Sequence, residues 1–130
     1  MKGFIFTDKD IDTNGIFYAR ITPNIFSVEQ LFDALYYSCW FPTYFGSNWD
    51  ALDEVVRDFS WIKEKKIIVR HESLPKISNK DLSVYLAILD GSFEYFDEND
   101  KDICYVFSKR DEQEVRDILL SIERSGLFEG

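Results

Sequence analysis

Two carboxylates one helical turn apart, Asp50 and Glu54, are the first residues whose spacing could support chemistry. Acids at i and i+4 could act as general acid and base if a pocket enclosed them. The single histidine, His71, ends a β-prone run, where a structural role is more common than catalysis. The sequence contains no GxSxG, GxxxxGK[ST], GxGxxG or HExxH motif. An enzyme is therefore the weaker interpretation, and we expect no catalytic residue.

The segment from Phe41 to Trp61, FPTYFGSNWDALDEVVRDFSW, favours binding instead. Four acids and one arginine give it a net charge of −3. An acidic helix is usually only a solvated face, but here Tyr44 and Phe45 stand beside Gly46 just before the acids. Asn48 follows, with an amide that could fix the loop or reach outward. Aromatic anchors beside unpaired carboxylates suit a protein interface with a cationic partner.

The composition agrees with a binding protein. The chain has 130 residues, of which 45% are hydrophobic and 17% aromatic, so we expect one domain with a substantial core. A net charge of −9 disfavours contact with nucleic-acid phosphates and favours a basic partner. No apolar run is long enough for a membrane span or a signal peptide. Cys39 and Cys104 are expected to be free thiols. The free thiols and the lack of a signal peptide predict a cytoplasmic protein, and we expect neither a metal nor a cofactor.

The first half of the chain alternates strand and helix signals. Phe4–Thr7 and Ile16–Ile21 are β-prone, and the Asn-Gly turn signal between them predicts a hairpin. Ser27 begins a helix through a capping box with Gln30. The buried face of that helix is expected to hold Phe32, Leu35, Tyr36 and Cys39.

A second helix is expected to begin at a Ser47 cap, with Asp50 in its first turn, where an acid favours the helix dipole. On a wheel of ~100° per residue, its apolar and charged side chains fall on opposite arcs. The apolar arc holds Trp49, Leu52, Val55, Val56 and Phe59. The charged arc holds Asp50, Asp53, Glu54, Arg57 and Asp58.

The second half continues the alternation. Lys66–His71 is typical of a strand buried on both faces of a parallel sheet. Ser78 begins a third helix, and Ile103–Ser108 forms another strand. Asp111–Arg124 is a last amphipathic helix with Gly126 as its stop. The fold class is therefore α/β with a small, mostly parallel sheet.

The stretch from Pro42 to Leu52, PTYFGSNWDAL, resembles the P-x-Y-[YF]-G-x-N-[LW]-D-A-L segment of the barstar family without a gap. Members of that family are intracellular inhibitors of small secreted bacterial ribonucleases. The resemblance covers roughly residues 15–108 and implies a three-stranded parallel sheet packed with helices. We expect residues 1–130 to form one barstar-like domain, with an extra N-terminal edge strand and a C-terminal helical extension over residues 109–130.

The resemblance also implies a binding mode. Family members insert the second helix and the preceding loop into the ribonuclease active site, where acids stand in for substrate phosphates. Glu54 falls at the central phosphate-mimicking position, which is an aspartate in the archetype, and Asp53 replaces a family tryptophan. The partner-binding residues expected here are Tyr44, Gly46, Asn48, Asp50, Asp53, Glu54, Arg57 and Asp58.

The leading hypothesis is a barstar-like inhibitor or immunity protein that neutralises a small basic bacterial ribonuclease. Asp53 in place of the family tryptophan, and the additional residues before and after the matched region, motivate an alternative. In it, the chain is a barstar-like module directed against a basic toxin that is not a ribonuclease. An enzyme would need a pocket that converges on Asp50, Glu54 or His71. One further acid of the family's interface has two candidates here, Asp90 and Glu94.

Overall fold

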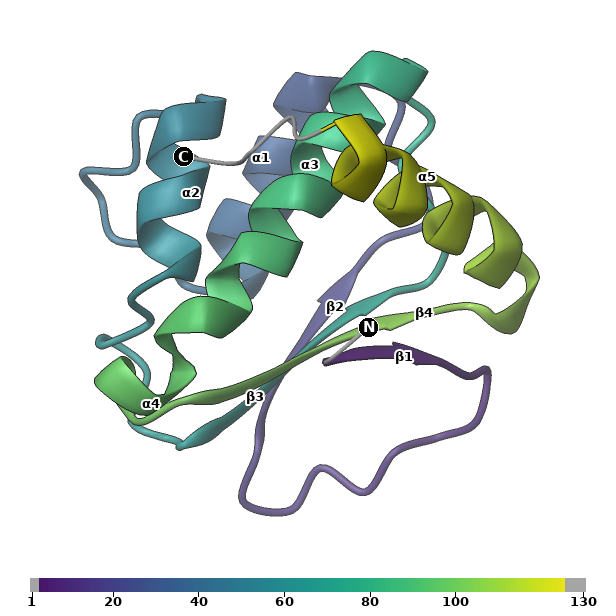
Figure 1. Cartoon of the computed structure of the whole chain (residues 1–130). Helices are drawn as coiled ribbons and strands as arrows, with labels where there is room; N and C mark the ends of the chain where they lie inside the picture. The colour runs from purple at the N-terminus through teal and green to yellow at the C-terminus, as the bar shows by residue number, and fades with distance from the viewer. Residues whose placement is uncertain (1–2, 126–130) are drawn as a thin grey trace.

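Four parallel strands form the sheet of the computed structural model, which describes residues 3–125 (Figure 1). The strands lie in the order β1-β4-β3-β2. Phe17 pairs with Ile67, Ile67 with Ile103, and Phe4 with Tyr105. This confirms the α/β class, the parallel sheet and the extra edge strand. The strands are β1 (Phe4–Phe6), β2 (Phe17–Ile21), β3 (Lys66–His71) and β4 (Asp102–Phe107).

The predicted hairpin between β1 and β2 is wrong. The two strands occupy opposite edges of the sheet and run in the same direction, so residues 7–16 must return across its length (Figure 1). The Asn-Gly signal produces only a local turn, in which Ile16 N donates to Thr13 O at 3.0 Å and Gly15 has a φ of 75°. The partner of β1 is β4, which lies far away in the sequence, and a turn signal carries no information about such a pairing.

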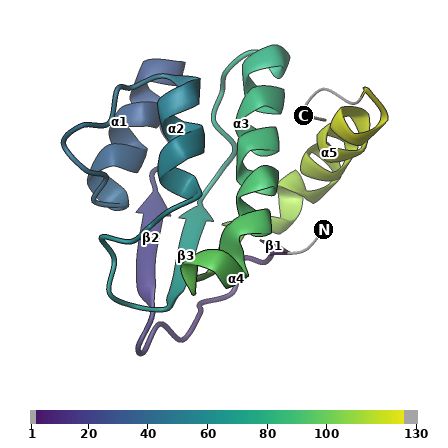
Figure 2. The same ribbon diagram turned by 60° about the vertical axis from the view of Figure 1, so that its left-hand side comes forward.

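Helices cover one face of the sheet, and the loop of residues 7–16 lies on the other side (Figures 1 and 2). The main helices are α1 (Val28–Ser38), α2 (Trp49–Val56), α3 (Asn79–Ser92) and α5 (Glu112–Ser125). Shorter turns are η1 (Phe93–Tyr95), α4 (Phe96–Asn99) and η2 (Lys109–Asp111). The extra C-terminal helix is thus confirmed as α5, and the expected stop at Gly126 lies outside the described residues.

Two helix starts follow the sequence prediction. Ser27 accepts a hydrogen bond from Gln30 N at 3.1 Å, and Gln30 Oε1 accepts one from Phe26 N at 2.7 Å. Ser78 caps α3 by accepting from Asp81 N at 3.1 Å. Each cap satisfies a backbone N–H that the first helical turn leaves without a partner.

The core lies between the helices and the sheet face that they cover. Strand side chains alternate, so one face is apolar and the other carries Tyr18, Arg20 and Arg70. The buried side chains that join α1 and α2 to the sheet include Ile21, Leu31, Leu35, Leu52, Val56 and Val69. This packing holds the outer faces of both helices in fixed positions.

No helix within residues 3–125 is long and apolar enough to cross a membrane.

Candidate functional site

The loop between α1 and α2 turns one aromatic side chain outward and the next one inward. Phe45 N donates to Pro42 O at 3.0 Å, which closes a tight turn. Phe45 is buried against Phe41, with ring centroids 5.0 Å apart. Tyr44, at the tip, remains 72% exposed. The packing of Phe45 therefore fixes the loop and presents the Tyr44 ring to solvent.

Asn48, and not Ser47, caps α2, which corrects the sequence prediction. Asn48 Oδ1 accepts from Ala51 N at 2.8 Å, and its Nδ2 donates to Gly46 O at 3.4 Å. Ser47 has a φ of 52°, so it belongs to the loop, and Asp50 takes the second helical position. The amide of Asn48 thus fixes the loop from within, while Gly46 leaves its backbone exposed.

The outer face of α2 carries two carboxylates that the protein does not use internally. Asp50 and Glu54 are exposed, and neither has a hydrogen bond or ion pair to any residue in the described range. They lie one turn apart, about 6 Å between Cβ atoms. The opposite face is buried through Leu52, Val55 and Val56, as the sequence predicts. Asp50 and Glu54 are therefore available to a cationic partner.

Asp53 and Arg57, by contrast, are committed to each other. Arg57 Nη2 lies 2.8 Å from Asp53 Oδ2, and Arg57 Nε donates to Asp53 Oδ1 at 3.2 Å. Arg57 Nη1 also donates to Tyr95 OH at 3.0 Å, and the guanidinium carbon lies 4.9 Å from the Tyr95 ring centroid. Asn99 donates to the Arg57 carbonyl. This cluster neutralises Asp53 and ties the end of α2 to the segment from η1 to α4.

The remaining candidates lie nearby in the sequence or on the neighbouring segment. Asp58 accepts a hydrogen bond from Ser60 at 3.0 Å, so it is also partly used within the chain. Glu94 is exposed in η1, directly before Tyr95 of the cluster. Asp90 is exposed near the end of α3, and partial burial raises its pKa. Glu94 is thus the better placed of the two acids to extend the face of α2.

His71 is a buried structural residue, as its position in the sequence predicts. Nδ1 lies 3.2 Å from Val106 O, and Nε2 lies 2.6 Å from Tyr85 OH. The carbonyl can only accept, so Nδ1 carries the proton and Tyr85 donates to Nε2. The ring stacks on Phe107 at 4.3 Å, and burial lowers the pKa of His71 to about 4. Both ring nitrogens are satisfied internally, which leaves no free base.

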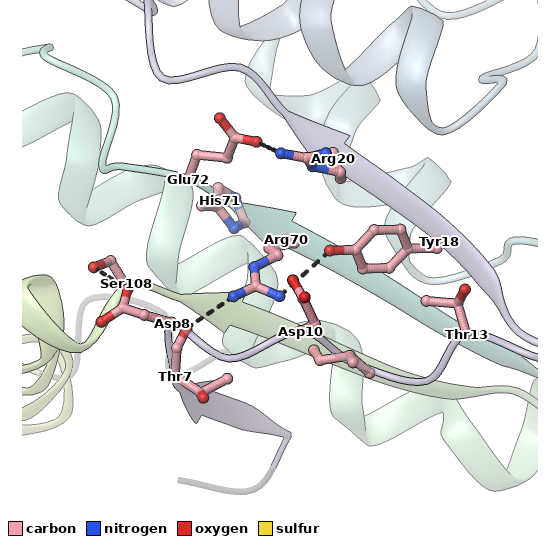
Figure 3. Close-up of a pocket in the computed structure, with 11 residues that line it drawn as sticks. Thr7, Asp8, Asp10, Thr13, Tyr18, Arg20, Arg70, His71, Glu72 and Ser108 are labelled. Carbon is pink, nitrogen blue, oxygen red and sulfur yellow. Dashed lines mark hydrogen bonds and ion pairs between the residues drawn. The ribbon is translucent and has the colours of Figure 1, made fainter.

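A polar hollow of about 420 Å³ lies on the sheet face away from the helices (Figure 3). Apart from Asp10, its charged groups have partners within the chain. Arg70 donates to Lys9 O, Thr7 O and Tyr18 OH at 2.8, 3.2 and 3.4 Å. Arg20 pairs with Glu72, and Ser108 donates to Asp8 at 2.7 Å. His71 lines this hollow, but both of its ring nitrogens are bonded within the chain. Neither Asp50 nor Glu54 lines it, so the hollow does not bring the candidate acids together.

Two features of this region escape the sequence analysis. One is the link from Arg57 to Tyr95, because the two residues are 38 positions apart and only the fold brings them together. The other is the exposure of Tyr37 and Trp40 at the end of α1, 74% and 68%. The i, i+4 spacing of Asp33 and Tyr37 on an outward stripe could have indicated the exposure of Tyr37.

Comparison with known proteins agrees with the geometry. The family model described as Barstar (barnase inhibitor) matches residues 19–108, which is more than half of the chain. The match includes α1, the loop, α2, β3, β4 and the end of β2. No curated protein matches the chain. On the strength of the family model, this protein belongs to the barstar family.

Proposed function

We propose that the protein is an inhibitor, or immunity protein, that blocks the cationic active site of a small basic bacterial ribonuclease. In this proposal it acts in the cytoplasm of the producing cell. Helix α2 supplies the blocking surface together with the loop that precedes it. The observation that carries the proposal is the pair Asp50 and Glu54, exposed and without internal partners on a helix anchored to the core.

The physical reasoning begins with the enzyme's substrate. A ribonuclease active site is a concave region whose Arg, Lys and His side chains bind an anionic chain. Two carboxylates one turn apart on a rigid helix can occupy such a site in place of phosphates, and the helix excludes RNA by its bulk. The net charge of −9 attracts a basic enzyme and speeds their encounter.

Within this surface the residues have different roles. Glu54 is the central carboxylate, and Asp50 lies one turn before it. Tyr44 adds apolar contact at the rim, and Asn48 holds the loop by capping α2. Asp53 acts as the counter-ion of Arg57 and contributes little net charge toward the partner.

The test is inhibition of a panel of small basic bacterial ribonucleases by the full chain. We expect 1:1 inhibition that is competitive with RNA, because both occupy the same site. Glu54→Gln should weaken it strongly, and Glu114→Gln, on exposed α5, should not. Inhibition that persists at saturating RNA, or equal inhibition by both variants, would exclude the α2 face as the blocking surface.

A second candidate target is a basic toxin that is not a ribonuclease. The ion pair of Asp53 and Arg57 favours it, because it places a charged pair at the position where the family has a tryptophan. If no ribonuclease in the panel is inhibited, but a basic deoxyribonuclease is inhibited in a manner that depends on Glu54, this second target is correct.

A further inference from the structure

Residues 21–56, which include α1, the loop and α2, contain no lysine, arginine or histidine. The acids in this stretch are Glu29, Asp33, Asp50, Asp53 and Glu54. The cationic residues that bound it are Arg20 and Arg57, and each is paired with a carboxylate. All the ionised side chains of residues 21–56 are therefore acidic.

Four large aromatic side chains of residues 21–56 are exposed, and one of them, Phe26, already lies under Lys76, which leaves three. Tyr37 is 74% exposed, Trp40 68% and Tyr44 72%. We call these three residues the aromatic surface. Tyr37 continues an outward stripe of α1 that begins with Glu29 and Asp33, at i, i+4 spacing. Tyrosine and tryptophan at such exposure are the residues most often found as anchors in protein interfaces.

Ring contacts through the core connect part of the aromatic surface to the start of α2. Helices α1 and α2 lie side by side over the sheet (Figure 2). The Tyr37 ring packs on Tyr36 at 5.1 Å, and Tyr36 stacks on Phe45, which follows Tyr44, at 6.4 Å. The path continues through Phe32 to Trp49, the first residue of α2, with rings 6.0 and 4.9 Å apart. Trp40 rests on Phe17 at 5.1 Å. These contacts give the exposed rings a fixed base.

Three other rings of the described chain, including Phe26 of the same stretch, already have a cation over them. Lys76 lies 4.9 Å from the Phe26 ring centroid, Arg57 lies over Tyr95, and Arg116 lies 5.0 Å from Phe6. No cation of residues 3–125 lies over Tyr37, Trp40 or Tyr44. The faces of these three rings are therefore open to cationic side chains from another molecule.

We infer that the aromatic surface is a second part of the partner interface, which receives Lys or Arg side chains of the basic partner through cation–π contacts. This inference rests on the proposed function, because it assigns these residues to the same partner. Carboxylates of α2 enter the active site, while Tyr37 and Trp40 contact basic side chains around it. A second copy of this chain is a poor occupant, because two such acidic faces would repel each other.

The first test uses any ribonuclease that the wild-type chain inhibits. Tyr37→Leu/Trp40→Leu keeps apolar bulk and removes the rings, and the matched control is Phe26→Leu, 57% exposed with its own Lys76. We expect the double variant to raise the dissociation constant about tenfold or more, mainly through faster dissociation, and the control to change it less than about twofold. Wild-type affinity in the double variant, or an equal loss in the control, would overturn the inference.

A second test needs no ribonuclease, so it separates this inference from the proposed function. An octa-arginine peptide is titrated into the full chain and followed by the NMR shifts of the backbone amides and of the Trp40 indole N–H. We expect perturbation at Tyr37, Trp40 and Tyr44 together with α2, and little at Phe26. Perturbation confined to α2 would refute the second contact region, even if ribonuclease inhibition is established.

If no ribonuclease is inhibited, the proposed target is wrong, and the peptide titration alone still tests whether the aromatic surface binds cationic side chains.

Sedimentation of the wild type and the double variant tests whether a second copy of the chain occupies the aromatic surface instead. A wild-type dimer that becomes a monomer in Tyr37→Leu/Trp40→Leu would show that a second copy occupies the aromatic surface. That result would also overturn the inference.

Discussion

The outer face of α2 and the open face of the sheet are both polar, but they use their charges differently. On the open face, Arg70 binds two backbone carbonyls and Tyr18, and Arg20 pairs with Glu72 (Figure 3). On α2, Asp50 and Glu54 have no such partner among the described residues. Charges matched within the chain stabilise the fold, whereas charges left unmatched on a rigid element are available for binding. Substitutions should therefore separate the two regions, with stability changing in one and affinity in the other.

The largest expected effect is on affinity, from Glu54→Gln. In a complex its carboxylate would lose a charge-assisted contact and leave the partner's buried cation unpaired, which costs about 2–5 kcal/mol. We expect the dissociation constant to rise about 30-fold or more, with an unchanged unfolding temperature. Binding kinetics and thermal denaturation of the same samples provide the measurements. Loss of stability without loss of affinity would reverse the assignment of this region.

His71 should make stability depend on pH, because it is a buried polar group that is satisfied only when neutral. Its pKa is about 4 in the fold, below the ordinary value near 6.5, so the unfolded chain binds the proton first as pH falls. Its contribution is complete above pH ~6.5 and falls as pH decreases toward 4, by about 2–3 kcal/mol. Urea unfolding across this range tests the effect.

The control for that experiment is His71→Gln, whose amide can donate to Val106 O and accept from Tyr85 without titrating in this range. We expect the variant to lose the extra pH dependence between 6.5 and 4. If the wild type and the variant show the same slope, other groups cause the acid sensitivity and His71 is not its source.

Arg70→Met should destabilise the protein by about 2 kcal/mol, because it leaves the carbonyls of Thr7 and Lys9 without their donor and loosens the loop of residues 7–16. Arg20→Met is the matched control, since the exposed ion pair with Glu72 contributes at most about 1 kcal/mol. Neither variant should change affinity. Denaturant titration ranks the two variants, and an equal or reversed ranking would contradict the assignment.

The smallest expected effect concerns Arg57. Arg57→Gln removes the cation that neutralises Asp53, so the face of α2 becomes more negative. We expect association with a basic partner to become about two- to threefold faster at low salt, measured by stopped flow. Lys65→Gln is the charge-matched control. It also removes one positive charge from an exposed ion pair, with Asp100, but Lys65 lies outside α2. Slower association of Arg57→Gln would indicate that Arg57 itself contacts the partner.

Local signals in the sequence predicted much of the fold. The strand Lys66–His71, the caps Ser27 and Ser78, and the buried face of α2 are all confirmed. Each depends on hydrogen bonds or periodicity within a few residues, which the sequence shows directly. Even Phe59, which follows the end of α2 with a φ of 51°, remains buried as its apolar character predicts.

The sequence predictions were wrong or incomplete where two neighbouring residues could both cap a helix, or where a contact joins residues far apart in the sequence. Ser47 and Asn48 can both cap a helix, and the bond from Asn48 to Gly46 decides between them. The pairing of β1 with β4 and the contact of Arg57 with Tyr95 depend on the fold. For the same reason the sequence suggested four free acids near α2, while the structure leaves Asp50 and Glu54 without internal partners.

The central claim is that these two carboxylates supply the charge that meets the partner. Its most direct test is the association rate constant of the wild type and of Asp50→Asn/Glu54→Gln with an inhibited ribonuclease, at about 20 and 500 mM salt. We expect the wild-type rate to fall steeply with salt, and the double variant to be slow at low salt with most of that dependence lost. Equal salt dependence in both proteins would contradict the account, because the attraction would then come from acids elsewhere on the molecule.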